Sequence, residues 1–207
     1  MKPTRFLRHR GEQAFTLVEL LLVVGIMAIL TASVGPGLLR VMGGANLTQA
    51  GNRVTDLVAL AHQDALNHNA MTAVVLLTNC SWDATLSGRA LVPLRLQDGV
   101  WTQTGSWAVL PSSTRAYGDT AATTGLPSAT GSFPALSLTG HAVDLSTCSA
   151  FVFNPDGTVY GDASSSRTAY VQYAADPAPS GSGNSTLKNY YDLVLSADSG
   201  GIHVLRP

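Results

Sequence analysis

The feature that most constrains this 207-residue chain is an apolar run close to its N-terminus. It reads FTLVELLLVVGIMAILTASVG, from Phe15 to Gly35, and its 21 residues carry one charge, that of Glu19. A helix needs about 20 apolar residues to cross the hydrocarbon of a bilayer. Four basic residues precede the run and would hold its start in the cytoplasm: Lys2, Arg5, Arg8 and Arg10. The run therefore predicts a transmembrane helix over 15–35, with the rest of the chain exported.

Glu19 is the part of this run that a secretory signal or a plain anchor does not explain. A carboxylate inside a membrane segment costs about 2.5–3.5 kcal/mol on insertion scales, so a partner for it is expected. The residues after the run, TASVGPG, also offer only weak small-x-small cleavage sites. Both observations favour a third kind of segment, in which the acid has a purpose of its own.

The string AFTLVELLLVVGIMAIL, from Ala14 to Leu30, resembles the leader junction of type IV pilins and type II secretion pseudopilins. The resemblance implies that a prepilin peptidase cuts between Ala14 and Phe15, and that Phe15 is then N-methylated. It also implies a role for Glu19 in subunit assembly. The new amine of Phe15 would be a cation at the membrane edge, and Glu19 of a neighbouring subunit could neutralise it.

Beyond the run, Pro36 and several glycines interrupt the helical pattern, which predicts a bend or linker over 36–45. Pro36 also lies where pilins commonly have a helix-bending proline. Helical periodicity then resumes over 46–69, with an apolar stripe formed by Leu47, Ala50, Val54, Leu57, Ala61 and Ala65. This stripe must pack against something, and the strand-like segments that follow are the available partner.

The remaining residues predict a β-rich region. Short segments rich in β-branched and aromatic residues predict strands at 72–78, 90–96, 106–110, 150–153, 158–160, 168–173, 190–196 and 202–205. The sequence FVFNPDGTVY, residues 151–160, predicts a hairpin in which Gly157 has a positive φ. Residues 111–140 and 174–189 read as surface loops. The expected fold is α+β: a long N-terminal transmembrane helix continues into an amphipathic helix packed on an antiparallel β-sheet or β-sandwich.

Two further stretches carry a narrower resemblance. Asn52–Leu77 is similar to H-type minor pseudopilins and FimT-like proteins, and GGANLTQAG, Gly43–Gly51, resembles the D type of verrucomicrobial pilin-like cassette proteins. These resemblances imply a minor structural subunit of a type II secretion pseudopilus or a type IV pilus, and not an enzyme. The implied partners are prepilin peptidase, other pilin or pseudopilin subunits and the assembly platform.

These inferences divide the chain into a leader peptide, a membrane and assembly helix, a bend, and an extracytoplasmic globular domain, which cover residues 1–14, 15–35, 36–45 and 46–207. The resemblance places the subunit in the inner membrane as a single-pass protein with a cytoplasmic N-terminus and a periplasmic domain. It would then enter a periplasmic pseudopilus or a cell-surface pilus.

Cys80 and Cys148 are the only two cysteines. In an exported domain they can form a disulfide. Their separation of 68 residues would make this bond contribute about 4 kcal/mol to the free energy of unfolding in the chain-entropy model. Two buried thiols are the alternative, and the sequence leaves both open.

Three other functions have weaker support. His62, Asp64 and His68 lack the four-residue histidine spacing of a helical metal site, and Asp156 and Asp162 lack the spacing of a calcium loop, so no metal or cofactor is expected. An exported enzyme would use the S-x-x-K pattern that begins at Ser185, but its companion motifs are missing.

The third alternative is a DNA-uptake or adhesive minor pilin. From Phe15 onward the chain has eight basic and twelve acidic residues, a net charge of −4, and Arg206 stands almost alone near the C-terminus. This balance argues against a nucleic-acid-binding surface.

Overall fold

The computed structural model describes residues 15–118, 136–143, 145, 148–161, 167–176 and 189–206. Within the helix and strands, the side chains of residues 33–43 and 167 lie outside this description. The chain divides into two compact units, Met1–Met42 and Gly43–Pro207. The following residues named above are outside the described residues: Lys2, Arg5, Arg8, Arg10, Ala14, Asp162 and Ser185.

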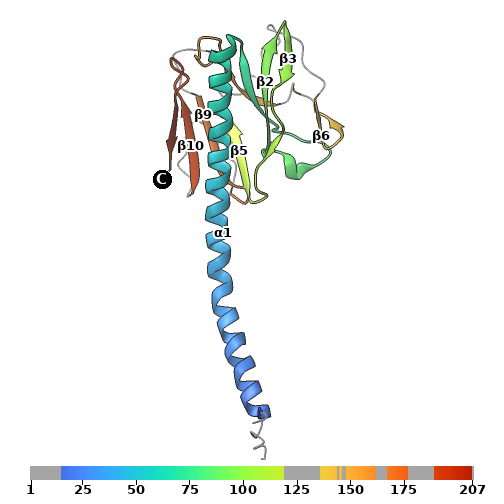
Figure 1. Ribbon diagram of the computed structural model, residues 1–207, viewed down its shortest axis with the longest axis vertical. Helices are drawn as coiled ribbons and strands as arrows, with labels where there is room; N and C mark the ends of the chain where they lie inside the picture. Colours follow the sequence, from blue (N-terminus) through green and yellow to red (C-terminus); the bar gives the residue numbers. More distant parts are fainter. Residues whose placement is uncertain are drawn as a thin grey trace, which may run out of the picture. The chain divides into compact units, whose positions relative to one another are not determined.

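One helix, α1, extends from Leu17 to His68 (Figure 1). Residues 36–45, for which a bend or linker is predicted, are all helical. A proline removes its own backbone hydrogen bond and its ring crowds the carbonyl four residues earlier, but a helix can continue on both sides of it. The bend at Pro36 stays a prediction. At the C-terminal end, Asn69 has a φ of 48° and the Ala70 amide donates to the Ala65 carbonyl at 3.3 Å, which ends the helix within one residue of the predicted boundary.

All strand pairings are antiparallel among the described residues. The first sheet has the order β3-β2-β1-β8, with β4 also paired to β2, and the second has the order β11-β10-β9-β5. A short ladder joins β6 to β7. The strands are β1 Thr72–Leu76, β2 Ala90–Gln97, β3 Val100–Gln103, β4 Ala108–Val109, β5 Thr114–Gly118, β6 Ser137–Leu138, β7 His141–Ala142, β8 Ser149–Phe153, β9 Arg167–Tyr173, β10 Tyr190–Leu195 and β11 Ile202–Leu205. The predicted α+β class with antiparallel sheets is confirmed.

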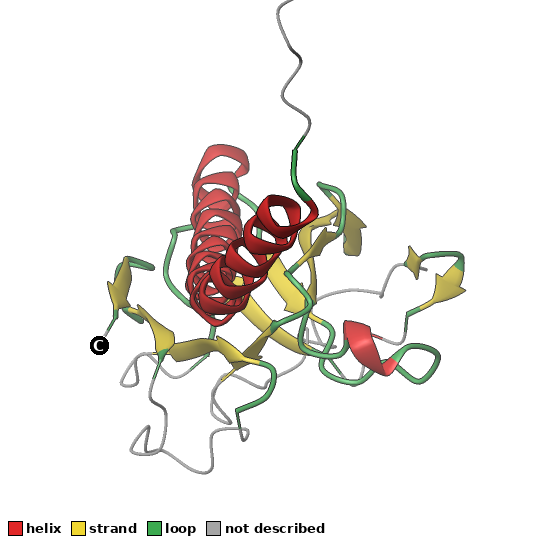
Figure 2. Cartoon of the chain, turned by 90° about the horizontal axis from the view of Figure 1, so that it is seen from below, coloured by secondary structure: helices red, strands yellow, loops and turns green. Residues whose placement is uncertain are grey.

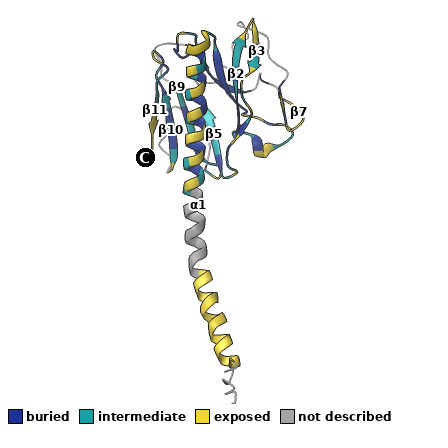
Figure 3. Ribbon diagram, in the orientation of Figure 1, coloured by how far each residue is buried: buried dark blue, intermediate teal, exposed yellow. Residues whose placement is uncertain are grey.

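The part of α1 in the second unit lies against strands of both sheets (Figure 2). All six residues of the predicted apolar stripe are buried, whereas the opposite side of this part of the helix is exposed (Figure 3). They pack on side chains from the first sheet, such as Val74 and Phe153, and from the second, such as Val171 and Leu193. We call this cluster the helix-facing core. It fixes the face of α1 that remains accessible.

Several close contacts hold α1 on the sheets. The Thr72 hydroxyl donates to the Ala61 carbonyl at 2.7 Å. Gly51 lies directly against the ring of Tyr191, since a Cβ built at Gly51 would be 2.5 Å from two ring carbons. His62 lies against two turns, because a Cβ at Gly157 or at Gly200 would come within 2.9 Å of its ring. Helix α1 therefore packs closely on a tyrosine ring at Gly51 and on two glycine turns at His62.

The predicted strands are found with one exception and some additions. Residues 158–160 form only a single bridge, Phe153 with Val159, rather than a strand. The hairpin turn itself is present, with a φ of 85° at Gly157 and a hydrogen bond of 2.8 Å from the Asn154 amide to the Thr158 carbonyl. Strands β3, β5, β6 and β7 were not predicted, and both β5 and β6 lie in the segment 111–140, which was predicted to be a surface loop.

The opposite face of the first sheet covers a second core, which contains the completely buried Trp101. Cys80 and Cys148 both belong to this second core and are buried, with 4% and 5% of their surface exposed. The structure records no disulfide among the described residues. The pairing of the two cysteines stays a prediction.

Candidate functional site

The first candidate site is the beginning of α1. Thr16 precedes the helix, and its amide and its hydroxyl both donate to Glu19 Oε2 at 3.0 Å. The Glu19 amide donates in turn to the Thr16 hydroxyl at 3.3 Å. This reciprocal arrangement is a capping box, which satisfies backbone donors that a helix N-terminus otherwise leaves free.

The capping box uses only one of the two carboxylate oxygens of Glu19. No described residue donates to Glu19 Oε1, and the side chain is exposed. A carboxylate can accept several hydrogen bonds at once, so Glu19 can remain bonded to Thr16 and still accept a cationic donor from another molecule. The T-x-x-E pattern at residues 16–19 is the sequence signal that could have predicted this cap.

The residues around Glu19 form an exposed apolar surface. Twelve large apolar side chains between Phe15 and Leu30 are exposed, from 45% at Val23 to 81% at Phe15. An apolar surface of this extent is a contact surface for lipid or for another protein. Among the described residues, no helical stretch combines the length and the apolar character that crossing a bilayer requires.

The remaining predicted site residues are Pro36, in the first unit, and Cys80 and Cys148, in the second. Pro36 lies further along α1, while Cys80 and Cys148 lie in the second core. In the second unit, Asp64 Oδ1 contacts Arg95 Nη1 at 3.0 Å and His68 Nδ1 at 2.9 Å.

The two groups considered above as metal ligands thus have other partners. The Asp64 carboxylate is shared between Arg95 and His68, and the ring of His62 stands 5.3 Å from the ring of Phe153. Asp156 Oδ1 accepts hydrogen bonds from the Thr158 hydroxyl at 2.7 Å and from the Thr158 amide at 3.0 Å, and these bonds lower the pKa of Asp156. The contacts of Asp64, His62 and Asp156 thus stabilise the fold locally.

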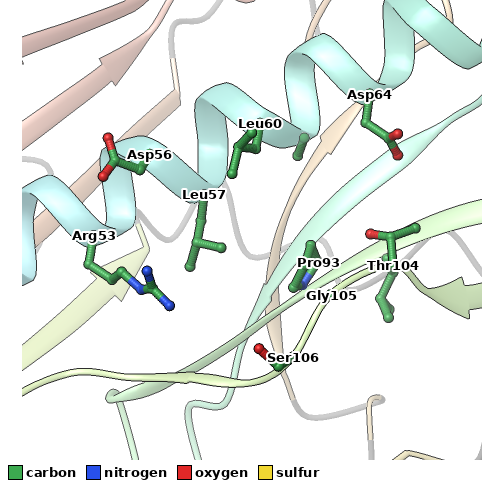
Figure 4. A pocket seen from close by; sticks show the side chains of 11 residues that line it. Arg53, Asp56, Leu57, Leu60, Asp64, Pro93, Thr104, Gly105 and Ser106 are labelled. Atoms are coloured by element: carbon green, nitrogen blue, oxygen red, sulfur yellow. The ribbon is translucent and has the colours of Figure 1, made fainter.

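A second candidate site, which no sequence pattern indicated, is a cavity of about 340 Å³ between α1 and the edge of the first sheet (Figure 4). Figure 4 shows Arg53, Leu57, Leu60 and Asp64 projecting from the helix toward Pro93 and the segment that carries Ser106. A wider depression of about 810 Å³ adjoins it and shares Arg53 and Asp56. We call the 340 Å³ cavity the helix groove.

The comparisons with known proteins identify the N-terminal segment. Residues 9–35 match a family model described as the prokaryotic N-terminal methylation motif. No curated protein matches the chain.

The solved structures similar to this chain include a minor pseudopilin and a minor pilin. The minor pseudopilin EpsH from the type 2 secretion system of Vibrio cholerae is 10% identical, with a TM-score of 0.47, and the alignment covers 78% of this chain and 98% of that one. The type IV minor pilin FimU of Pseudomonas aeruginosa (strain PAO1) is 14% identical, with a TM-score of 0.44, and the alignment covers 78% and 92%.

Proposed function

We propose that this chain is a pilin-like minor structural subunit that is processed by a prepilin peptidase and assembled into a type II secretion pseudopilus or a type IV pilus. The observation that carries the proposal is the match of residues 9–35 to the N-terminal methylation motif. This segment contains the proposed cleavage junction between Ala14 and Phe15, the proposed methylation site at Phe15, and Glu19.

The exposed apolar start of α1 supports the same proposal. A surface with twelve exposed large apolar side chains is costly in water, at about 25 cal/mol for each Å² of apolar surface, so it needs a permanent covering. Lipid would cover it before assembly, with residues 15–35 anchored in the inner membrane and the second unit in the periplasm. Helices of neighbouring subunits would cover it in the filament.

The unoccupied oxygen of Glu19 gives this assembly a mechanism. Cleavage would convert the Phe15 nitrogen from an amide into a cationic amine. A neighbouring Glu19 could accept a hydrogen bond from that amine through Oε1 while keeping its own capping bonds to Thr16. Each charge would lower the cost of removing the other from water, which favours the assembled state.

The direct test is the mature N-terminus of the protein isolated from cells that contain a prepilin peptidase. Removal of 14 of the 207 residues would leave a chain of 193 that begins with N-methylphenylalanine. Mass spectrometry of the intact chain and of its N-terminal peptide checks this. An intact Met1, or a cut C-terminal to the apolar run, would contradict the proposal.

A second test separates the charge of Glu19 from its capping role. Glutamine also serves at this position of a capping box, so Glu19→Gln keeps the cap and removes the charge, whereas Glu19→Ala removes both. We expect both variants to reach the membrane and both to enter filaments poorly in a co-assembly assay with the unaltered chain. Incorporation of Glu19→Gln at the level of the unaltered chain would show that only the cap matters.

A further inference from the structure

We draw no further inference here: the strongest candidate, the helix groove between α1 and the edge of the first sheet, is lined by Asp56 and Asp64 as well as Arg53 and thus favours no class of ligand, and nothing in the described part of the chain shows what covers its apolar wall.

Discussion

Replacing Gly51 by alanine tests the packing of α1 on the second sheet. Gly51 is inside a helix, where alanine is favoured over glycine by about 1 kcal/mol. Helix propensity alone therefore predicts that the substitution stabilises the protein. The packing around Gly51 predicts that it destabilises the protein. A Cβ at this position would be 2.5 Å from Cγ and Cδ1 of Tyr191, about 1 Å closer than a normal carbon contact.

The size of the loss in stability depends on how far the Tyr191 ring must move. Tyr191 is 6% exposed and belongs to the helix-facing core, so its ring cannot shift into solvent. Inserting a methyl group into a packed core costs about 1–3 kcal/mol. Displacing the ring also disturbs Arg206, whose guanidinium carbon lies 5.1 Å from the ring centre, a contact that contributes about 0.5–1 kcal/mol. After subtraction of the gain in propensity, Gly51→Ala should lower the free energy of unfolding by about 0.5–3 kcal/mol.

The matched control is Gly44→Ala, in the same helix and the same unit, where an added Cβ meets nothing within 4 Å. This substitution should stabilise the protein by up to about 1 kcal/mol. Urea unfolding of the full chain in detergent, followed by the fluorescence of the buried Trp101, measures both variants. In a Tyr191→Ala background, Gly51→Ala should lose its penalty. Equal stabilisation by Gly51→Ala and Gly44→Ala would refute the packing argument.

The second unit offers three other tests. Burial raises the pKa of Asp192, so the folded state holds this proton more tightly than the unfolded state does. The free energy of unfolding should therefore fall as pH rises through the raised pKa. The Asp192→Asn variant should lack that fall when unfolding is measured as a function of pH. Gly200→Ala should lower the free energy of unfolding by about 2–4 kcal/mol in the same urea assay, because φ is 61° and the new Cβ would be 2.2 Å from the Gly157 carbonyl oxygen. Non-reducing mass spectrometry of exported protein should find Cys80 joined to Cys148, and two alkylated thiols would contradict this disulfide.

The amphipathic helix was predictable because its signal is local. The stripe from Leu47 to Ala65 repeats with the period of a helix, and every one of its residues is buried. The sequence TRAYG of β5 carries no comparable alternation and ends in a glycine. It forms a strand because β9 pairs with all five of its residues, from Thr114 to Gly118, and pairing between segments distant in sequence is invisible to a pattern search.

The two candidate sites also differ in whether their signal is local in the sequence. Phe15 and Glu19 lie four residues apart in one recognisable string, so the amino-acid sequence alone is enough to find them. Arg53 reads as an ordinary solvated helical residue, and its significance depends on residues 104–106, which are about fifty positions away. The pairing of β3 and β4 with β2 places residues 104–106 opposite the helix.

The capping box raises the question of whether it alone explains Glu19, and the magnitudes decide against this. An N-terminal cap stabilises a helix by about 0.5–2 kcal/mol, whereas a carboxylate in a membrane segment costs about 2.5–3.5 kcal/mol at the bilayer centre and less toward the surface. A neutral glutamine would provide a similar cap without the cost of the charge. The charge on Glu19 therefore requires a compensation that the cap does not provide, and under the proposed function cleavage before Phe15 would create an amine of opposite charge four residues earlier.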